Sequence, residues 1–419
     1  FAGGPAKVAV ISSALCGMVS GSSVGNTVTT GSVTIPMMKK AGYKPEFAGA
    51  VEAAASTGGQ IMPPIMGAAA FLMAEYMNVT YGEVALRAIL PAVLYFTGIF
   101  ISVHLEARKL GLKGLERSEL PKIGKLMGKI YLLTPLVVLV WLVTTNTRTM
   151  QFSASIAILC AIAVSLFDKD NRITVAKILE ALEAGGKSAI TVAVACSMAG
   201  VISGCITATG LASKLISAVV SVSNSVTFID PTFVALFLTM ICCIVLGMGV
   251  PTTANYCIMA STCAPILITI GVPKMAAHFF VFYFGIVADI TPPVALAAYA
   301  GSAIAKSNPM RTGINATKLA IAAFIVPYIF CMNPAMLLID VTVWSMIQII
   351  VTSLVGLFGV AAALEGFLLR PMNPVFRIAT AIGGILMMIP GTFTDSIGIA
   401  LFAAVVIIQF IQKKKAVAA

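Results

Sequence analysis

Four short polar stretches interrupt a chain that is otherwise strongly apolar. Two are rich in hydroxyl groups and glycine and contain one asparagine each; they run from Ser20 to Thr27 (SGSSVGNT) and from Gly247 to Asn255 (GMGVPTTAN). The other two end in a Pro-Pro pair and run from Gly58 to Pro64 (GGQIMPP) and from Ala288 to Pro293 (ADITPP). Unwound helix ends expose carbonyl oxygens that, with hydroxyl and amide oxygens, suit a hard cation such as Na⁺, whereas helix N-termini attract anions.

Asp289 is one of very few acids inside the apolar segments, and such residues are functional candidates by default. It either takes part in cation coordination or proton coupling, or it caps a helix start ahead of Thr291. The hydroxyl groups have a second interpretation too, because Ser, Thr and Gly also allow close helix packing. We expect His278 at the membrane interface, and Glu52 at a cavity wall or a helix end.

The composition defines the environment of these residues. Of the 419 residues, 59% are hydrophobic and 10% are charged, and the mean hydropathy is +1.01, whereas a soluble protein carries about 25% charged residues. The sequence therefore predicts an integral membrane protein with room for roughly ten to twelve membrane segments. It shows no nucleophile with its base, zinc-ligand spacing or phosphate loop, so we predict neither an enzyme nor a cofactor. Because the chain starts at Phe1 and is apolar at once, we expect it to be part of a longer protein.

Uninterrupted apolar runs predict eight membrane spans. They lie near residues 85–103, 130–145, 150–167, 188–206, 319–332, 342–364, 376–390 and 397–412. Four further segments are interrupted, namely two hairpins at 6–38 and 232–270 and two long helices at 47–77 and 275–305. Proline removes a backbone donor and clashes with the preceding turn, so each Pro-Pro pair breaks its helix. The predicted helix breaks are Pro63, Pro64, Pro292 and Pro293.

Loop charge sets the orientation of these segments. The net charge is +11, and the loop from Arg108 to Lys129 is the most basic, so we place it in the cytoplasm. The loop carrying Lys169, Arg172, Lys177 and Lys187 is predicted to be cytoplasmic as well. Counting spans from these loops, the first hairpin and its broken helix enter from the cytoplasm, and the second pair enters from the opposite face.

The two opposed units repeat each other with an offset of 229 residues. The residues that match without a gap include Asn26 with Asn255, Pro36 with Pro265, Gly42 with Gly271, Pro63 with Pro292 and Pro64 with Pro293. These residue types mark turns and breaks, so their agreement in register indicates a structural repeat. Opposed repeats with discontinuous helices are typical of secondary transporters, whose broken helix ends meet near the membrane midplane.

The sequence thus predicts an all-α polytopic membrane protein, an inverted-repeat secondary transporter with two re-entrant helical hairpins and two broken helices. We divide the chain into four parts. They are a first transport-domain repeat (1–82), scaffold helices with cytoplasmic loops (83–187), a second transport-domain repeat (188–310) and a C-terminal transmembrane extension (311–419).

Three motifs resemble the large membrane subunit of tripartite ATP-independent periplasmic (TRAP) transporters. They are GQIMPPIMG from Gly59 to Gly67, GMGVPTT from Gly247 to Thr253 and DITPPVALAAYAG from Asp289 to Gly301. The resemblance covers residues 1 to about 310 well. The tail from Glu365 is similar to the C-terminal extension of the fused permeases that work with TAXI-type binding proteins.

The resemblance implies an elevator-type, Na⁺-coupled importer of organic acids such as dicarboxylates, in the bacterial inner membrane. Its implied partners are a periplasmic TAXI-type substrate-binding protein and a small membrane subunit, fused or separate. Sodium sites carried over from the family fall at Ser22, Ser23, Asn26, Gly59, Gln60, Gly247, Gly249, Thr252, Thr253, Asn255 and Thr291. The tips also resemble those of divalent-anion/Na⁺ symporters, which need no binding protein, and a channel or membrane scaffold is a third interpretation.

Overall fold

The computed structural model of the chain describes residues 3–112, 127–145, 149–167, 172–226, 229–339, 342–389 and 391–418. These residues form helices and no β-strand, apart from an isolated bridge between Phe367 and Pro371. The predicted all-α fold is therefore confirmed for the described part of the chain.

The first unit is a helical hairpin followed by an interrupted helix. Helix α1 (Gly4–Ser20) turns back into α2 (Ser23–Lys40), and both pack against α3 (Pro45–Gly59). Gly21 makes the turn with a φ of 64°, a left-handed conformation that glycine adopts at no steric cost. The chain then unwinds through the first Pro-Pro pair before α4 (Gly67–Met77) begins.

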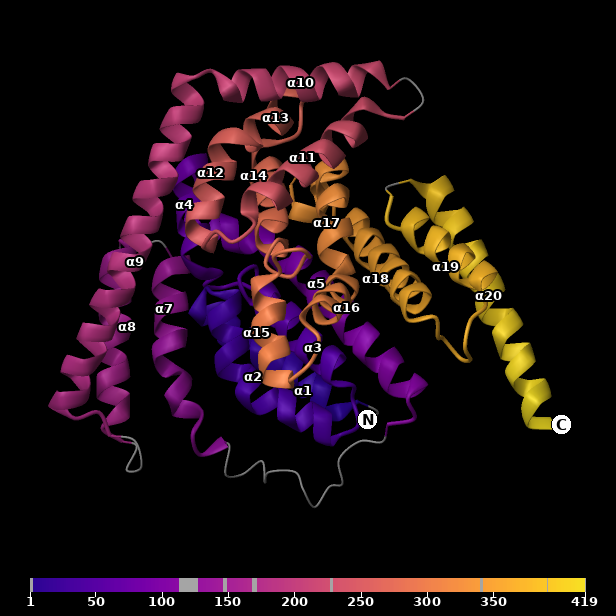
Figure 1. Cartoon of the computed structure of the whole chain (residues 1–419), viewed down its shortest axis with the longest axis horizontal. Helices are drawn as coiled ribbons and strands as arrows, with labels where there is room; N and C mark the ends of the chain where they lie inside the picture. Colours follow the sequence, from indigo (N-terminus) through magenta and orange to yellow (C-terminus); the bar gives the residue numbers. More distant parts are fainter. Residues whose placement is uncertain are drawn as a thin grey trace.

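The second unit has the same order of elements. Its hairpin consists of α11 (Pro231–Gly247) and of α12 (Thr252–Thr262) with α13 (Ala264–Thr269). Helix α14 (Lys274–Val287) then ends before the second Pro-Pro pair, and α15 (Leu296–Ala305) follows it. In Figure 1 the first hairpin occupies the lower half and the second the upper half, and α4 and α15 lead away from the centre in opposite directions.

The structure follows the predicted offset residue by residue. Adding 229 to the bounds of α2 gives 252 and 269, the first residue of α12 and the last residue of α13. Met66 and Ala295 are related by the same offset, and both adopt positive φ, 56° and 36°, directly before α4 and α15. Gly42 and Gly271 likewise have φ values of 98° and 94°. The two units are thus copies of one backbone arrangement.

The remaining helices surround these units. They are α5 (Tyr81–Lys109), η2 (Ile130–Leu133), α7 (Thr134–Thr144), α8 (Met150–Ser165), α9 (Val175–Ala208), α10 (Leu211–Ser225), α16 (Pro309–Leu319), α17 (Ile321–Met332), η3 (Pro334–Leu337), α18 (Val343–Glu365), α19 (Pro374–Leu386) and α20 (Thr392–Ala418). Figure 1 shows α8 and α9 along one side of the two units and α18 to α20 along the other. Helix α5 is fixed to the first unit by Tyr95, whose hydroxyl donates to the Ala54 carbonyl oxygen at 2.7 Å.

Five helices among the described residues are long and apolar enough to cross a membrane. They are Tyr81–Lys109, Val175–Ala208, Pro309–Met332, Val343–Glu365 and Phe393–Lys414. Each coincides with one of the eight predicted spans. The other three predicted spans, at 130–145, 150–167 and 376–390, form apolar helices of fewer than 18 residues.

One predicted loop is wrong. The sequence analysis places Lys177 and Lys187 in a cytoplasmic loop, but α9 begins at Val175 and continues without a break to Ala208. The stretch is rich in Ala, Leu and Glu, which favour helix, and Lys187 Nζ lies 2.5 Å from Glu183 Oε1 one turn away. Lys169 of that loop, and residues 113–126 of the most basic loop, lie outside the described residues.

Candidate functional site

A cavity of about 390 Å³ lies between the two hairpin tips. Its lining consists of the first tip, the second tip and single residues of α4, α9, α15 and the second helix break, namely Ser20 to Val24, Gly249 to Thr253, Ala68, Val192, Leu296 and Asp289. Polar stretches that are more than 200 residues apart in the sequence therefore meet at one place.

Four helices begin at this cavity. Helices α2 and α12 start at Ser23 and Thr252, α15 starts at Leu296, and Ala68 lies in the first turn of α4. Helix N-termini carry unpaired N–H groups and a partial positive charge. Among the described residues of the lining, Asp289 is the one charged side chain. The positive potential in this cavity therefore comes from the backbone.

Two crossed hydrogen bonds join the two units beside the cavity. Ser23 Oγ donates to Asp289 Oδ2 at 2.5 Å, and Thr252 Oγ1 donates to Gln60 Oε1 at 3.1 Å. Adding 229 to 23 and to 60 gives 252 and 289, so each bond is the copy of the other. The first residue of each returning hairpin helix thus binds the helix break of the opposite unit. One bond ends on a carboxylate and its counterpart on a neutral amide.

Asp289 does not cap a helix start. Helix α14 ends at Val287, and the N-cap position of α15 is occupied by Ala295. The side chain of Asp289 is 7% exposed, and the donor that it binds is Ser23. Of the two interpretations that the sequence allows, the structure leaves a role in cation coordination or proton coupling.

The two tip asparagines are buried in equivalent positions. Asn26 Nδ2 lies 3.0 Å from Ser56 Oγ, and Asn255 Nδ2 donates to the Gly285 carbonyl oxygen at 2.9 Å. Residues 56 and 285 are again 229 apart, so each asparagine binds the same place on the broken helix of its own unit. Asn255 Oδ1 is buried and has no hydrogen-bond partner among the described residues. A buried amide oxygen without a donor is available to coordinate a cation.

Glycines allow these asparagines to approach the broken helices. A Cβ atom on Gly59 would lie 2.5 Å from the Cα atom of Gly17, so α1 and α3 cross in backbone contact. In the second unit a Cβ atom on Gly247 would lie 2.9 Å from Asn255 Nδ2. The predicted site glycines therefore provide space in these crossings.

The other predicted site residues divide into two groups. Ser22 caps α2 by accepting a hydrogen bond from the Gly25 amide at 3.1 Å, and it lines the cavity together with Gly249 and Thr253. Thr291 instead donates to the Val287 carbonyl oxygen of its own helix at 2.8 Å and lies outside the lining. The structure thus brings most of the predicted residues to the tips but leaves the Thr291 side chain apart.

His278 differs from its predicted place at the membrane interface. It is 4% exposed, and its Nδ1 lies 2.8 Å from the Tyr256 hydroxyl. Helix α14 is buried along nearly its whole length by aromatic packing, which also covers this histidine. Its sequence position near a helix end gives no sign of that cover.

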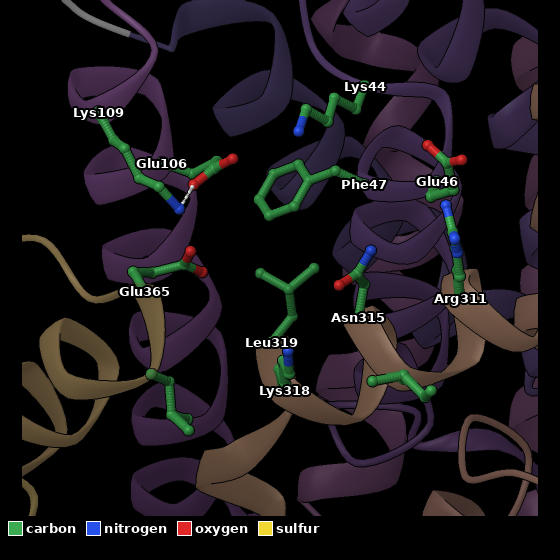
Figure 2. A pocket seen from close by; sticks show the side chains of 12 residues that line it. Lys44, Glu46, Phe47, Glu106, Lys109, Arg311, Asn315, Lys318, Leu319 and Glu365 are labelled. Atoms are coloured by element: carbon green, nitrogen blue, oxygen red, sulfur yellow. Dashed lines mark hydrogen bonds and ion pairs between the residues drawn. The ribbon is translucent and has the colours of Figure 1, made fainter. Parts of the chain in front are cut away.

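A second cavity, of about 470 Å³, lies among helix ends and contains none of the predicted site residues. Figure 2 shows Glu106, Lys109 and Glu365 on one wall and Glu46, Arg311 and Asn315 on the opposite wall. Lys109 Nζ lies 2.9 Å from Glu106 Oε2. The helices that form it carry the basic residues next to the predicted cytoplasmic loops.

Two opposed units, each with a hairpin and a broken helix, define a polytopic membrane protein with the architecture of transporters. The family model for the tripartite ATP-independent periplasmic transporter, DctM component, matches residues 1–345. The chain belongs to this family, as the motifs indicate.

Two curated proteins are similar to parts of the chain. The C4-dicarboxylate TRAP transporter large permease protein DctM of Vibrio cholerae is 33% identical over 108 residues, which are 26% of this chain and 23% of that protein. The uncharacterized protein y4mL of Sinorhizobium fredii is 34% identical over 107 residues, which are 24% of this chain and 25% of that protein. The aligned segments thus span about a quarter of each relative.

Proposed function

We propose that this chain is the membrane permease of a Na⁺-coupled TRAP importer of organic acid anions. The observation that carries the proposal is the cavity between the hairpin tips, with its four helix N-termini and its crossed hydrogen bonds. The fused, TAXI-type branch of the family is part of the proposal, since the C-terminal helices α18 to α20 follow the family segment.

The cavity suits an organic anion. A carboxylate there would face the N-termini of α2, α12, α4 and α15, each of which offers unpaired N–H groups and a partial positive charge. No lysine or arginine is needed for this attraction, and none is present in the described lining. The relative named as a C4-dicarboxylate permease makes dicarboxylates the first substrates to test.

The tips suit Na⁺ as the coupling ion. Asn255 offers a buried amide oxygen without a donor, and Asn26 holds the corresponding place in the first unit. Hydroxyl, amide and backbone oxygens are the ligands expected of such sites, and Asp289 adds a carboxylate beside them. We propose that Na⁺ binds at each tip and that these ions stabilise the closed arrangement around the substrate.

The crossed hydrogen bonds tie the two units together across the cavity. We propose that the units move as one body, as an elevator, and carry the cavity across the bacterial inner membrane. A periplasmic binding protein of the TAXI type would deliver the substrate, and a small membrane subunit would complete the scaffold.

Uptake by reconstituted protein tests the proposal. The full-length permease with its small subunit is placed in liposomes, and uptake of a radiolabelled C4-dicarboxylate is measured with and without a Na⁺ gradient and the cognate binding protein. A thermal-shift screen of that binding protein against organic acids selects further substrates. We expect uptake only when both the Na⁺ gradient and the binding protein are present.

The alternatives give different results in the same assay. Uptake that needs Na⁺ but no binding protein would indicate a divalent-anion/Na⁺ symporter. Ion conductance without coupled uptake would indicate a channel. Either result would refute the proposed importer.

A further inference from the structure

Glu52 is a fully buried acid at the middle of α3, away from the cavity between the tips. Its carboxyl group is surrounded by hydroxyl groups. The Thr30 and Thr34 hydroxyls of α2 lie within hydrogen-bonding distance of Oε1 and Oε2, and Ser56 Oγ lies 3.4 Å from Oε1. None of the hydrogen bonds or ion pairs of the described residues joins Glu52 to a cation.

The ionisable groups near α3 lie elsewhere on its neighbours. Helices α1, α2, α5, α15 and α16 pack against α3. Their ionisable side chains, with those of α3 itself and of the residues that flank these helices, lie within about two turns of a helix end; they are Lys7, Lys39, Lys40, Lys44, Glu46, Glu83, Arg87, His104, Glu106, Arg108, Lys109, Lys306, Arg311 and Lys318. Lys7 contacts His104, Lys39 donates to the Ala305 carbonyl oxygen, and Lys109 pairs with Glu106. Glu52 is therefore buried without a countercharge.

A carboxylate in this position would be a costly arrangement. An ionised side chain without a partner is disfavoured by several kcal/mol in a buried apolar setting, whereas a neutral acid with hydroxyl partners is tolerated. A bound proton or a bound cation would remove the charge. The arrangement of the hydroxyl groups decides between these two.

Each threonine hydroxyl has a single proton, and both hydroxyls have another acceptor. Thr30 Oγ1 lies 2.8 Å from the Asn26 carbonyl oxygen, and Thr34 Oγ1 lies 3.1 Å from the Thr30 carbonyl oxygen. A hydroxyl that donates to its own helix has only lone pairs left for Glu52. The contact is then satisfied when the carboxyl group brings its own proton. The carboxyl oxygens touch these hydroxyls directly, which leaves a proton as the ligand that fits between them.

The second unit shows that the backbone arrangement does not require this acid. The positions 229 residues after Glu52, Thr30 and Thr34 are Val281, Met259 and Cys263, and all three are buried. The same helix packing is therefore built from apolar side chains in one unit and from an acid with two hydroxyls in the other. The polar version is an addition to one unit.

We propose that Glu52 is a proton-binding site of the first unit, lined by Thr30, Thr34 and Ser56. The proton completes the hydrogen bonds of the carboxyl group and removes a buried charge. If the chain is the importer proposed above, this proton is a ligand distinct from Na⁺ and gives uptake a dependence on pH. That consequence rests on the proposed function, but proton binding itself does not.

Infrared difference spectroscopy tests proton binding without transport. The purified complex is compared with its Glu52→Gln variant at neutral pH, in H₂O and in D₂O. We expect the wild type to show the carbonyl stretch of a protonated carboxylic acid that shifts in D₂O and is missing from the variant. Glu83→Gln is the control, because Glu83 is partly exposed and lies 3.4 Å from Arg87, and it should leave the band unchanged.

A second variant guards against loss of folding. Thr34→Val keeps the carboxyl group but removes one hydroxyl partner, so the same band should move to a higher frequency. The proposal is overturned if no acid band disappears with Glu52→Gln, or if Thr34→Val leaves the band in place.

Proteoliposomes then separate this proposal from the proposed function. If dicarboxylate uptake is observed, it should fall as the pH is raised in the wild type and lose that dependence in Glu52→Gln. A complete absence of Na⁺-driven uptake in the wild type would refute the importer, while the infrared band would still decide whether Glu52 holds a proton.

Discussion

The crossing of α1 and α3 offers the sharpest test of the first tip. Gly59→Ala places a methyl group 2.5 Å from the Cα atom and 2.7 Å from the carbonyl carbon of Gly17. Carbon atoms in contact normally lie about 3.5–4.0 Å apart, and backbone atoms cannot turn away as a side chain can. The two helices must therefore separate by about 1 Å.

That separation acts on the hydrogen bonds of Asn26, which span the same crossing. Its Nδ2 lies 2.9 Å from Ser13 Oγ on α1 and 3.0 Å from Ser56 Oγ on α3. A shift of about 1 Å breaks one of these bonds, which costs about 1–3 kcal/mol for a buried group, and the overpacking adds about 1–3 kcal/mol. Because about 1.4 kcal/mol corresponds to a factor of ten, the Na⁺ concentration for half-maximal uptake should rise at least tenfold.

The assay is Na⁺-dependent uptake in proteoliposomes, together with thermal unfolding of the purified variant. Gly25→Ala is the matched control, since Gly25 is exposed in the same tip and its added Cβ atom would meet only Ser22, at 3.2 Å or more. If Gly59→Ala unfolded at the same temperature and titrated with Na⁺ as Gly25→Ala does, the reasoning about this crossing would be refuted.

Three further variants test other parts of the site. Asp289→Asn keeps the size of the side chain but replaces a charge-assisted bond from Ser23 by a neutral one, a loss of about 1 kcal/mol, so half-maximal uptake should need about fivefold more Na⁺; an unchanged Na⁺ titration would exclude Asp289 from coupling. Asn255→Ala removes the buried amide oxygen and should weaken Na⁺ dependence without lowering the affinity of the binding protein for substrate, as separate titrations will show. Gly58→Ala would put a Cβ atom 2.1 Å from the Tyr95 ring and should lower the unfolding temperature, whereas normal stability would contradict the packing of α3 on α5.

Much of the fold can be predicted from the residues that interrupt apolar segments. The Pro-Pro pairs, Gly42 and Gly271 mark breaks and turns because few other residues adopt those backbone conformations. The offset of 229 follows from them, and the structure repeats it at helix bounds that contain no identical residue. The extent of α9 could not be predicted in this way, because charged residues end an apolar run without ending a helix.

The candidate site is predictable in composition but not in connectivity. The sequence identifies Ser23, Gln60, Thr252 and Asp289 as polar groups at tips and breaks, yet pairs each tip with the break of its own unit. The structure shows Ser23 bound to a residue 266 positions away, in the other unit. Such a contact depends on how the two units pack, and no local pattern records that.

Glu52 shows a signal that the sequence does contain. Asn26, Thr30 and Thr34 follow one another at intervals of four residues on α2, as do Glu52 and Ser56 on α3. Residues four apart share a helix face, so these are polar stripes within otherwise apolar helices. Two such stripes on consecutive helices predict that they face each other, a stronger sign than a lone acid at a helix middle.

The two units are equal in backbone and unequal in charge. Asp289 stands where the first unit has Gln60, and Glu52 stands where the second unit has Val281, so each unit carries one buried acid at a position that is neutral in its copy. A symmetric pair of units provides two equivalent halves of a cavity, but identical chemistry in both halves would give two equivalent ion sites. The different acids make the two halves respond differently to Na⁺ and to protons. Exchanging them, by Glu52→Val with Val281→Glu, would place an acid among Met259 and Cys263 without hydroxyl partners, and we expect that variant to lose stability where Glu52→Gln does not.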